Sequence, residues 1–295
     1  MSKIGFIGLG IMGKPMSKNL LKAGYELVVC DVVKAAVDEI VAAGATAVAT
    51  PKAVAEQADI IITMLPNSPQ VKQVILGENG IIEGAKKGTI IIDMSSIAPL
   101  VSREVALKLA EKGIEMIDAP VSGGEPKAID GTLSVMVGGK QEVFDKCFPI
   151  IDKMAGSVVL TGDIGAGNVT KLANQIIVAI NIAGMSEALV MASKAGVDPE
   201  KVYQAIRGGL AGSTVLDAKA PLVLDRKFDP GFRINLHIKD LNNVLETSHE
   251  VGVPLPLTAA VMEMMQALKV DGLGNDDHCS LVKYYEKLAH VEVKR

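Results

Sequence analysis

The stretch Lys3–Gly13, KIGFIGLGIMG, decides the fold of this chain. It begins with an apolar run typical of a buried strand, and Met12–Ala23 follows with the spacing of an amphipathic helix. Between the two lies a G-x-G-x-x-G motif formed by Gly8, Gly10 and Gly13. The first glycine permits a tight turn, the second lets the backbone approach a pyrophosphate, and the third lets the helix pack on the strand. A strand, this turn and a helix together predict a dinucleotide-binding βαβ unit.

Asp31 supports this interpretation from a second position. It follows another apolar run, Tyr25–Cys30, and so ends the next predicted strand. A carboxylate there can accept hydrogen bonds from the ribose of a bound dinucleotide. The alternative is a structural glycine turn beside an incidental acid. The cofactor-binding residues predicted from this part of the chain are Gly8, Leu9, Gly10, Ile11, Met12, Gly13 and Asp31.

Short apolar runs alternate with helical patterns through the first half of the chain. The predicted strands are Lys3–Ile7, Tyr25–Cys30, Ile60–Met64, Ile90–Asp93, Glu115–Asp118, Leu133–Val137 and Val158–Leu160. The helical patterns between them, several of which end at a glycine, indicate right-handed βαβ units and a parallel, doubly wound sheet. We therefore expect an α/β Rossmann-type dinucleotide-binding domain over residues 1–163.

The strand signals stop at Gly165, and Asn168–Ala195 is one long helical pattern. Further helical patterns lie around residues 199–207, 238–251 and 257–270. We expect an all-α domain over residues 164–295 for substrate binding and oligomerisation, joined to the first domain by a long interdomain helix. The uncharged run Leu172–Ser186 is shorter than a membrane span and contains three amide side chains, which favours a helix buried in protein.

Composition narrows the class of protein. The 295 residues carry a net charge of −4 with no basic tract, which argues against nucleic acid and anionic membrane partners. Three cysteines without a CxxC pair favour a reducing, cytoplasmic location. The run Asp276–Cys279 holds metal-ligand residue types, but adjacent ligands lack the spacing of zinc sites, so we expect no metal.

The segment Asp118–Gly124, DAPVSGG, runs from a predicted strand into a hydroxyl and two glycines. Successive backbone N–H groups in such a turn can form an anion-binding nest, and Ser122 adds a donor. This arrangement suits a substrate carboxylate, and the alternative is a plain Ser-Gly-Gly turn. The predicted substrate-binding residues here are Ser122, Gly123 and Gly124.

Polar side chains also begin the long helix. Lys171, Asn174 and Gln175 are spaced by three and four positions, so they share one helical face. A lysine that starts an uncharged helical run is a candidate functional group, because buried lysine is rare unless paired or functional. The alternative is a lysine whose head reaches solvent, with Asn174 as a satisfied core amide. In a later cluster, Phe232 and Lys239 lie near a helix start, where a Lys-Asp pair is ordinarily solvated.

Four separated motifs together resemble one family. GFIGLGIMGKPM, DAPVSGG, GAGNVTKLANQ and the later KDL are similar, in this order, to the β-hydroxyacid dehydrogenases, which include 3-hydroxyisobutyrate dehydrogenase. The resemblance covers the whole chain. The runs MLPNSPQVK, IDMSSIAPL and AIRGGLAGSTVLDAKAP resemble the bacterial tartronate semialdehyde reductases of this family in particular.

This resemblance implies roles for the matching residues. Lys171 matches the catalytic lysine, and Asn174 matches the amide that orients the substrate oxygen. Ser122–Gly124 match the loop that binds the substrate carboxylate. Lys239 matches a lysine beside the cofactor and substrate, and Phe232 is expected to line the substrate site.

Two later turns carry further matches to the family. Leu65, Pro66 and Gln70 lie in a turn expected to contact the cofactor. Ser96 stands where many members have threonine and keeps the hydroxyl, so we expect it to contact cofactor and substrate.

The residues after Asp31 depart from the family pattern. Close relatives often have arginine next, but Val32 and Val33 follow here, with Lys34 nearby. We therefore expect NAD as cofactor, with NADH preferred and NADPH possible, because a carboxylate repels a 2′-phosphate.

The implied reaction is hydride transfer to a small carboxylate-bearing aldehyde, with Lys171 as the general acid. For tartronate semialdehyde (2-hydroxy-3-oxopropionate) the product is D-glycerate. Alternatives within the class are 3-hydroxyisobutyrate or another short β-hydroxyacid. An imine reductase is less expected, since such enzymes often lack this lysine. From a different class, the chain could be a non-catalytic dinucleotide-binding protein. The family also implies a homo-oligomer, either tetramer or dimer.

Overall fold

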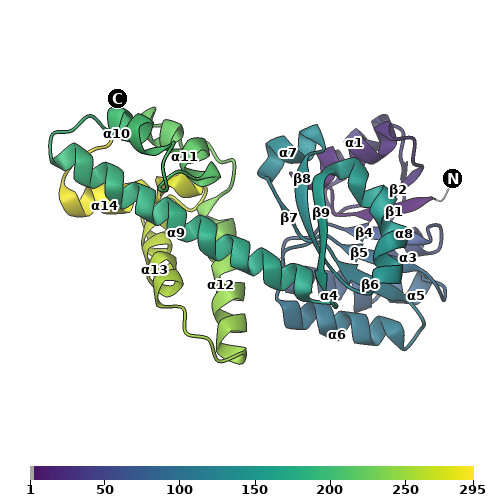
Figure 1. Ribbon diagram of the computed structural model, residues 1–295. Coiled ribbons are helices and arrows are strands. Elements are labelled where there is room, and N and C mark those ends of the chain that lie inside the picture. The colour runs from purple at the N-terminus through teal and green to yellow at the C-terminus, as the bar shows by residue number, and fades with distance from the viewer. Residues whose placement is uncertain (1–2) are drawn as a thin grey trace. The chain divides into compact units, whose positions relative to one another are not determined.

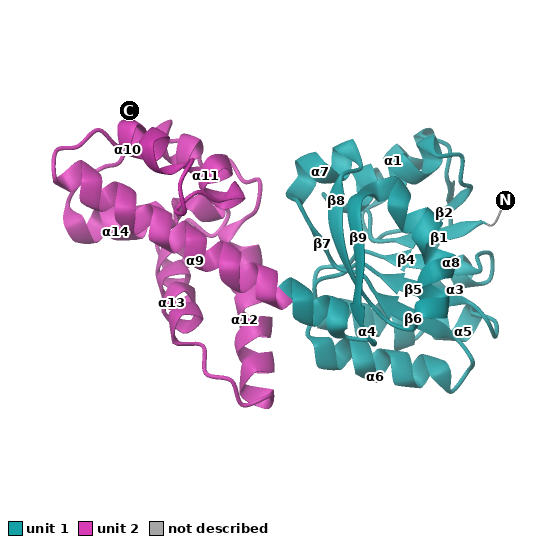
Figure 2. Ribbon diagram, in the orientation of Figure 1, with its two compact units in different colours: residues 1–171 teal, residues 172–295 magenta. Residues whose placement is uncertain are grey.

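The computed structural model describes residues 3–295. The chain divides into two compact units, residues 1–171 and residues 172–295, which we call the N-terminal unit and the C-terminal unit (Figure 2). Each is described separately below.

The N-terminal unit is built on a nine-stranded sheet (Figure 1). Its strands are β1 (Ile4–Ile7), β2 (Leu27–Cys30), β3 (Thr46–Ala47), β4 (Ile60–Thr63), β5 (Ile90–Asp93), β6 (Glu115–Asp118), β7 (Val121–Ser122), β8 (Leu133–Gly138) and β9 (Ala155–Gly162). Its helices are α1 (Gly13–Lys22), α2 (Lys34–Ala42), α3 (Pro51–Ala55), α4 (Ser68–Leu76), α5 (Ile81–Gly84), α6 (Pro99–Ala110), α7 (Gly124–Asp130), α8 (Gln141–Ile151) and the short 3₁₀ helix η1 (Asp152–Met154). The predicted α/β Rossmann-type fold is confirmed.

The strand order is β3-β2-β1-β4-β5-β6-β8-β7, with β9 paired to β8. Neighbours from β3 to β6 are parallel, as expected. The expectation of a wholly parallel sheet is wrong at β8, which runs antiparallel to β6 and β7. Residues 119–132 join β6 to β8 at one edge of the sheet without a crossover, so the chain reverses direction. β3 and β7 escape prediction because two-residue strands carry no periodicity.

The register of the parallel strands aligns their carboxyl ends. Ile7 pairs with Thr63, Thr63 with Asp93, and Asp93 with Asp118. The turns that follow β1, β4, β5 and β6 therefore lie along one edge of the sheet. Open α/β sheets bind ligands at this edge.

Both faces of the sheet are covered by apolar layers. Along β4, Ile61 belongs to one buried cluster and Ile62 to the other, and Ile91 and Ile92 of β5 alternate in the same way. Alternation follows from the pleat, which points successive side chains to opposite faces. Such burial on two sides explains why these strands are continuous apolar runs rather than alternating patterns.

Among the described residues, the regular elements of the C-terminal unit are all helices. They are the greater part of α9 (Ala166–Lys194), then α10 (Pro199–Ile206), α11 (Thr214–Leu224), α12 (Ile234–Glu250), α13 (Pro256–Val270), the 3₁₀ helix η2 (His278–Leu281) and α14 (Val282–Ala289). One isolated β-bridge joins Arg233 to Asp277. The predicted all-α C-terminal part is confirmed.

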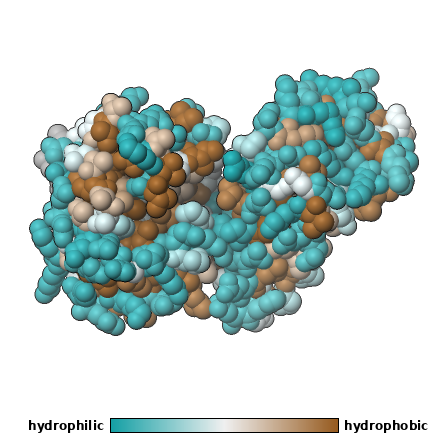
Figure 3. All heavy atoms as spheres, turned by 180° about the vertical axis from the view of Figure 1, so that it is seen from behind, coloured by the Kyte–Doolittle hydropathy of each residue, from teal (hydrophilic) through white to brown (hydrophobic). Residues whose placement is uncertain are grey.

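Helix α9 is long and apolar enough to cross a membrane by length and composition alone. Leu172, Ala179, Ile182 and Leu189 are instead buried in the apolar core of the C-terminal unit. Packing between helices thus accounts for part of its hydropathy, while Ile177 and Met191 of α9 are exposed. Figure 3 shows apolar side chains in patches on a surface that is otherwise mainly hydrophilic.

Candidate active site

The glycines of the loop after β1 are needed for different reasons. Gly8 has φ +99°, and a Cβ there would collide with the carbonyl oxygen of Met64. A Cβ on Gly13 would collide with the carbonyl oxygen of Gly8. Both glycines are therefore required by the protein's own packing. At Gly10, by contrast, an added Cβ has no neighbour within 4 Å. Open space at the mouth of α1 fits the pyrophosphate of a dinucleotide, whose approach a side chain would hinder.

Asp31 is held against this loop. One carboxylate oxygen accepts a hydrogen bond of 2.6 Å from the backbone N–H of Leu9, and the other accepts one of 2.7 Å from Val33. Gly10, Asp31 and Val33 line a common pocket of about 390 Å³ together with residues of α1 and α2. Four of the seven predicted cofactor residues of the first βαβ unit, Leu9, Gly10, Ile11 and Asp31, line this cavity, which has room for part of a dinucleotide.

A buried polar network joins the turns after β4 and β5. The Asp93 carboxylate accepts hydrogen bonds from the Thr63 hydroxyl at 2.9 Å and from the Ser95 N–H at 3.1 Å. The Ser95 hydroxyl in turn accepts the N–H of Leu65 at 2.9 Å. Burial raises the pKa of Asp93 to about 6, against the opposing effect of these hydrogen bonds. The network fixes the turn of Leu65 beside the turn that carries Ser96.

The other predicted residues of these two turns lie nearby in the chain. Leu65 and Pro66 follow β4, Gln70 is in the first turn of α4, and Ser96 lies between β5 and α6. All four belong to segments that leave the carboxyl ends of adjacent strands.

Asp118 anchors the start of α9, a role that the sequence analysis missed. Its two carboxylate oxygens accept the N–H groups of Gly165 and Asn168, both at 2.6 Å. Burial raises the pKa of Asp118 to about 6, although the two N–H groups lower it. The Asn168 side chain accepts the N–H of Ile97 and donates to the hydroxyl of Ser102. The helix that carries Lys171 is therefore bound at its first turn to the end of β6, to the loop after β5 and to α6.

The glycines at the mouth of α9 serve this anchoring. A Cβ on Gly167 would crowd the carbonyl oxygens of Met136 at 2.5 Å and Asp118 at 2.7 Å. A Cβ on Gly138 would crowd the N–H nitrogen of Gly167 at 2.7 Å. Backbone atoms of the protein therefore approach these glycines closely. The signal for Asp118 was present in the sequence, because it opens the DAPVSGG motif.

The predicted carboxylate-binding loop has the backbone of a tight turn. Ser122 belongs to β7 and pairs with Ser134 of β8. Gly123 and Gly124 follow with φ of +135° and +67°, values that other residues adopt only with strain. The segment begins four residues after the aspartate that anchors α9. One short stretch of chain therefore carries both the loop and the helix anchor.

Lys171 is 6 % exposed, so it is a buried cation rather than a solvated helix end. It lies three positions before Asn174 in α9, which places the two on one face of the helix. The Asn174 amide donates a hydrogen bond of 2.9 Å to the side-chain oxygen of Gln175. Gln175 donates in turn to Asp240 at 2.5 Å, and Asp240 pairs with Lys239 at 2.6 Å.

This chain of contacts corrects the ordinary interpretation of the Lys-Asp pair on α12. The Asp240 side chain is 3 % exposed and that of Lys239 is 21 % exposed, so the pair is largely buried. Charge pairs are retained in such surroundings only when further hydrogen bonds satisfy them. Gln175 supplies one of these bonds. Through it, the two predicted site residues Asn174 and Lys239 belong to one polar network.

Phe232 packs edge-on against two buried histidines, with ring centroids 5.7 Å from His237 and 5.3 Å from His278. The two histidines face each other through their Nδ1 atoms at 3.0 Å. His237 Nε2 lies 3.4 Å from the carbonyl oxygen of Gln175, which can only accept. A hydrogen on His237 Nε2 would satisfy this carbonyl oxygen and leave Nδ1 to accept from His278. Phe232 is thus tied to the helix turn that carries Asn174.

Asp277 holds the loop that presents Phe232. Its carboxylate accepts the N–H groups of Gly231 and Phe232 at 3.0 Å and pairs with Lys219 at 2.9 Å. Burial would raise the pKa of Asp277, but His278 and Lys219 lower it to about 2. Asp277 and His278 therefore stabilise the packing of the loop around Phe232. In the part of the chain that the structure describes, no three histidine, cysteine or acidic side chains converge as a metal site.

Two family models match consecutive parts of the chain. Residues 3–162 match the NAD binding domain of 6-phosphogluconate dehydrogenase, and residues 165–285 match the NAD-binding domain of NADP-dependent 3-hydroxyisobutyrate dehydrogenase. The chain belongs to the 3-hydroxyisobutyrate dehydrogenase family. It is accordingly an NAD(P)-dependent oxidoreductase that acts on CH–OH groups, as the resemblance of its motifs implied.

Individual members of the family show the same correspondence over nearly full length. The chain is 45% identical to 2-hydroxy-3-oxopropionate reductase of Escherichia coli over 98% of each sequence. It is 40% identical to 2-(hydroxymethyl)glutarate dehydrogenase of Eubacterium barkeri over 99% of this chain and 97% of that protein. The structure of Mycobacterium tuberculosis 3-hydroxyisobutyrate dehydrogenase with L-serine superposes with a TM-score of 0.90 at 29% identity, covering 97% and 99% of the two chains.

Within this family fold, the predicted site residues gather in two groups. Those of the N-terminal unit lie along the carboxyl edge of the sheet, from the glycine loop to the loop at Ser122. Those of the C-terminal unit share the polar network of Asn174 and Lys239. Helix α9 belongs to both groups, since it carries Lys171 at residue 171 and Asn174 one turn later.

Proposed function

We propose that this dehydrogenase reduces tartronate semialdehyde to D-glycerate with NADH, using Lys171 as the general acid. The observation that carries the chemistry is the burial of Lys171 on a helix whose first turn is anchored by Asp118. The choice of substrate is supported by the 45% identity to the E. coli 2-hydroxy-3-oxopropionate reductase.

In the proposed mechanism the bound nicotinamide supplies a hydride to the aldehyde carbon. Negative charge then develops on the carbonyl oxygen. The ammonium of Lys171 stabilises this charge and donates a proton to the oxygen, giving a primary alcohol. Asn174 orients the same oxygen, and its own amide is positioned by Gln175. Lys171 regains its proton from solvent after the product leaves.

The substrate carboxylate is assigned to the loop Ser122–Gly124. A hydroxyl and backbone N–H groups can bind a carboxylate without a second buried charge. In this proposal the loop binds the carboxylate and Asn174 binds the reacting oxygen, which orients a small substrate for hydride transfer. Phe232 and Ser96 are proposed to line the same site.

We assign the cofactor to the glycine loop Gly8–Gly13 and Asp31, with Leu65, Pro66, Gln70, Ser96 and Lys239 completing its contacts. We propose NADH over NADPH. Val32 and Val33 are exposed beside Asp31 and offer no cation to a 2′-phosphate.

The broader organisation is also proposed from the family. Residues 1–163 form the dinucleotide-binding domain, and residues 164–295 form the domain for substrate binding and oligomerisation. The protein is proposed to be a cytoplasmic homo-oligomer, dimer or tetramer. Its three cysteines are buried and unpaired, which is compatible with a reducing compartment.

A substrate panel tests the proposed activity. Oxidation of NADH and NADPH is followed with tartronate semialdehyde, and reduction of NAD and NADP with D-glycerate, 3-hydroxyisobutyrate, L-serine and L-threonate. We expect the highest kcat/KM for tartronate semialdehyde with NADH. A higher value for 3-hydroxyisobutyrate or L-serine would reassign the substrate. No turnover with any of them would favour a non-catalytic dinucleotide-binding protein.

A further inference from the structure

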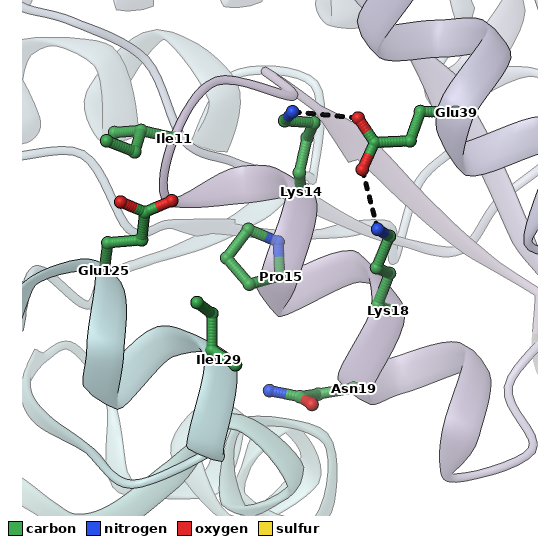
Figure 4. Close-up of a pocket in the computed structure, with 8 residues that line it drawn as sticks. All are labelled: Ile11, Lys14, Pro15, Lys18, Asn19, Glu39, Glu125 and Ile129. Carbon is green, nitrogen blue, oxygen red and sulfur yellow. Dashed lines mark hydrogen bonds and ion pairs between the residues drawn. The ribbon is translucent and has the colours of Figure 1, made fainter.

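The lysines nearest the dinucleotide pocket are all engaged by carboxylates of α2. Lys14 and Lys18 of α1 reach the two carboxylate oxygens of Glu39 at 2.8 and 2.6 Å (Figure 4). Lys34, the cation nearest to Asp31 in sequence, pairs with Asp38 at 2.6 Å. Two acidic residues of helix α2, Glu39 and Asp38, therefore form ion pairs with three lysines.

Glu39 lies in the pocket that Asp31 also lines, together with Lys14. Hydrogen bonds from Lys14 and then Lys18 lower the pKa of Glu39 to about 2, so it is ionised at neutral pH. A phosphate on the ribose assigned to Asp31 would enter a space lined by three carboxylates, those of Asp31, Glu39 and Glu125. Lys14, the one lysine among the described residues that line this space, is already paired with Glu39.

Stability alone does not account for this arrangement. The side chains of Glu39, Lys14 and Lys18 are 36–47 % exposed, and ion pairs at such exposure contribute little to folding. Their place beside the pocket matters more, because freed cations there would attract a phosphate. A charge-assisted contact with phosphate is among the stronger hydrogen bonds in proteins.

We propose that Glu39 is a specificity-determining residue for the cofactor, which favours NAD over NADP by withholding Lys14 and Lys18 from the 2′-phosphate. This inference rests on the proposed preference for NADH. Asp31 repels the 2′-phosphate directly, whereas Glu39 acts through the two lysines that it binds. The two carboxylates are thus separable by mutation.

The test is the variant Glu39→Gln, which keeps the shape of the side chain and removes its charge. Binding of 2′,5′-ADP and 5′-AMP to the full chain is measured by calorimetry, because these probes differ only in the 2′-phosphate. We expect the affinity for 2′,5′-ADP to rise roughly tenfold or more, as for one charge-assisted hydrogen bond, with that for 5′-AMP little changed. The kcat/KM ratio of NADPH to NADH should rise by a similar factor, and the gain should shrink in high salt.

A matched control is Glu104→Gln. Glu104 pairs with Lys72 at 2.6 Å with similar exposure, and neither residue lines the pocket. This variant should leave both affinities unchanged. Adding Lys14→Met and Lys18→Met to Glu39→Gln should abolish the gain.

The outcomes separate the inference from the proposed cofactor. A wild-type enzyme that prefers NADPH overturns both the NADH assignment and the role of Glu39. A wild-type enzyme that prefers NADH, with a Glu39→Gln variant whose affinity for 2′,5′-ADP is unchanged, overturns the role of Glu39 alone.

Discussion

Lys171 combines a charged side chain with near-complete burial, and this pairing is the residue-scale basis of the proposed chemistry. A buried cation is costly for folding unless it has partners or a function. In this enzyme it lies one turn after an anchored helix start. Single substitutions at the site should therefore separate chemistry from binding.

Lys171→Ala should reduce kcat by about 10²–10⁴-fold, as expected for loss of a general acid, while NADH binding stays nearly normal. The matched control is Lys194→Ala, which removes an exposed lysine from the other end of the same helix. Steady-state kinetics and NADH titration are measured on both variants. A fall in kcat of less than tenfold would show that another group donates the proton.

Gly123→Val should impair use of the substrate without loss of NADH affinity. The residue has φ +135°, so valine strains the turn, and its Cβ would collide with the side chain of Lys127 and so disturb the loop assigned to the substrate carboxylate. Gly44→Val is the control, because Gly44 has φ +113° but faces open space after α2. The KM for tartronate semialdehyde should rise in the first variant only. Equal kinetics in the two variants would show that the Ser122–Gly124 loop is a structural turn that does not bind the substrate.

At the scale of elements, the start of α9 determines the position of Lys171, the proposed catalytic lysine. Four hydrogen bonds join this helix start to Asp118 of β6, to Ile97 in the loop before α6 and to Ser102 of α6. The N-terminal N–H groups of a helix need such acceptors, and a carboxylate there also interacts favourably with the helix dipole. Asp118 meets both needs from inside the sheet.

Asp118→Asn should lower both stability and turnover. An amide oxygen can accept only one of the two N–H groups cleanly, so we expect a loss of about 1–3 kcal/mol in the free energy of unfolding. Because Lys171 follows within the same helix, kcat should fall while the affinity for NADH is retained. Asp163→Asn, an exposed change just before α9, is the control. Unchanged kcat in a destabilised Asp118→Asn protein would confine this aspartate to a folding role.

At the scale of the whole molecule, two buried carboxyl groups couple folding to pH. The pKa values of Asp93 and Asp118 are raised to about 6 from the ordinary value of 3.8, chiefly by burial. Between pH 4 and 6 the folded protein therefore binds more protons than the unfolded chain. The stability contributed by these groups is present below pH 4 and is lost as the pH rises through 6.

Asp93→Asn should flatten this dependence. Removing one titrating group should reduce the decline in unfolding free energy between pH 4 and 7 by up to about 3 kcal/mol, at 1.36 kcal/mol for each pKa unit. Urea unfolding of wild type, Asp93→Asn and the exposed-site control Asp59→Asn is compared at each pH. The expectation fails if the wild type and Asp93→Asn decline in parallel.

Much of the fold was within reach of the sequence because its signals are local. The glycine loop, the apolar runs of the strands and the uncharged run of α9 each reflect the conformation of neighbouring residues. The family motifs likewise named Lys171, Asn174 and the Ser122–Gly124 loop as site residues.

Only the tertiary structure decided what depends on residues far apart in the chain. Three features join segments separated by many residues: the reversal of β8, the anchoring of α9 by Asp118, and the hydrogen bond from Gln175 to Asp240. Sequence periodicity does not predict which buried acceptor will bind the N–H groups of a helix N-terminus. Nor does it predict which carboxylate will pair with Lys14 and Lys18. The sequence determined the elements and the chemistry of the site residues. Packing determined which charges are buried, paired or withheld, because burial and pairing exist only once distant elements come into contact.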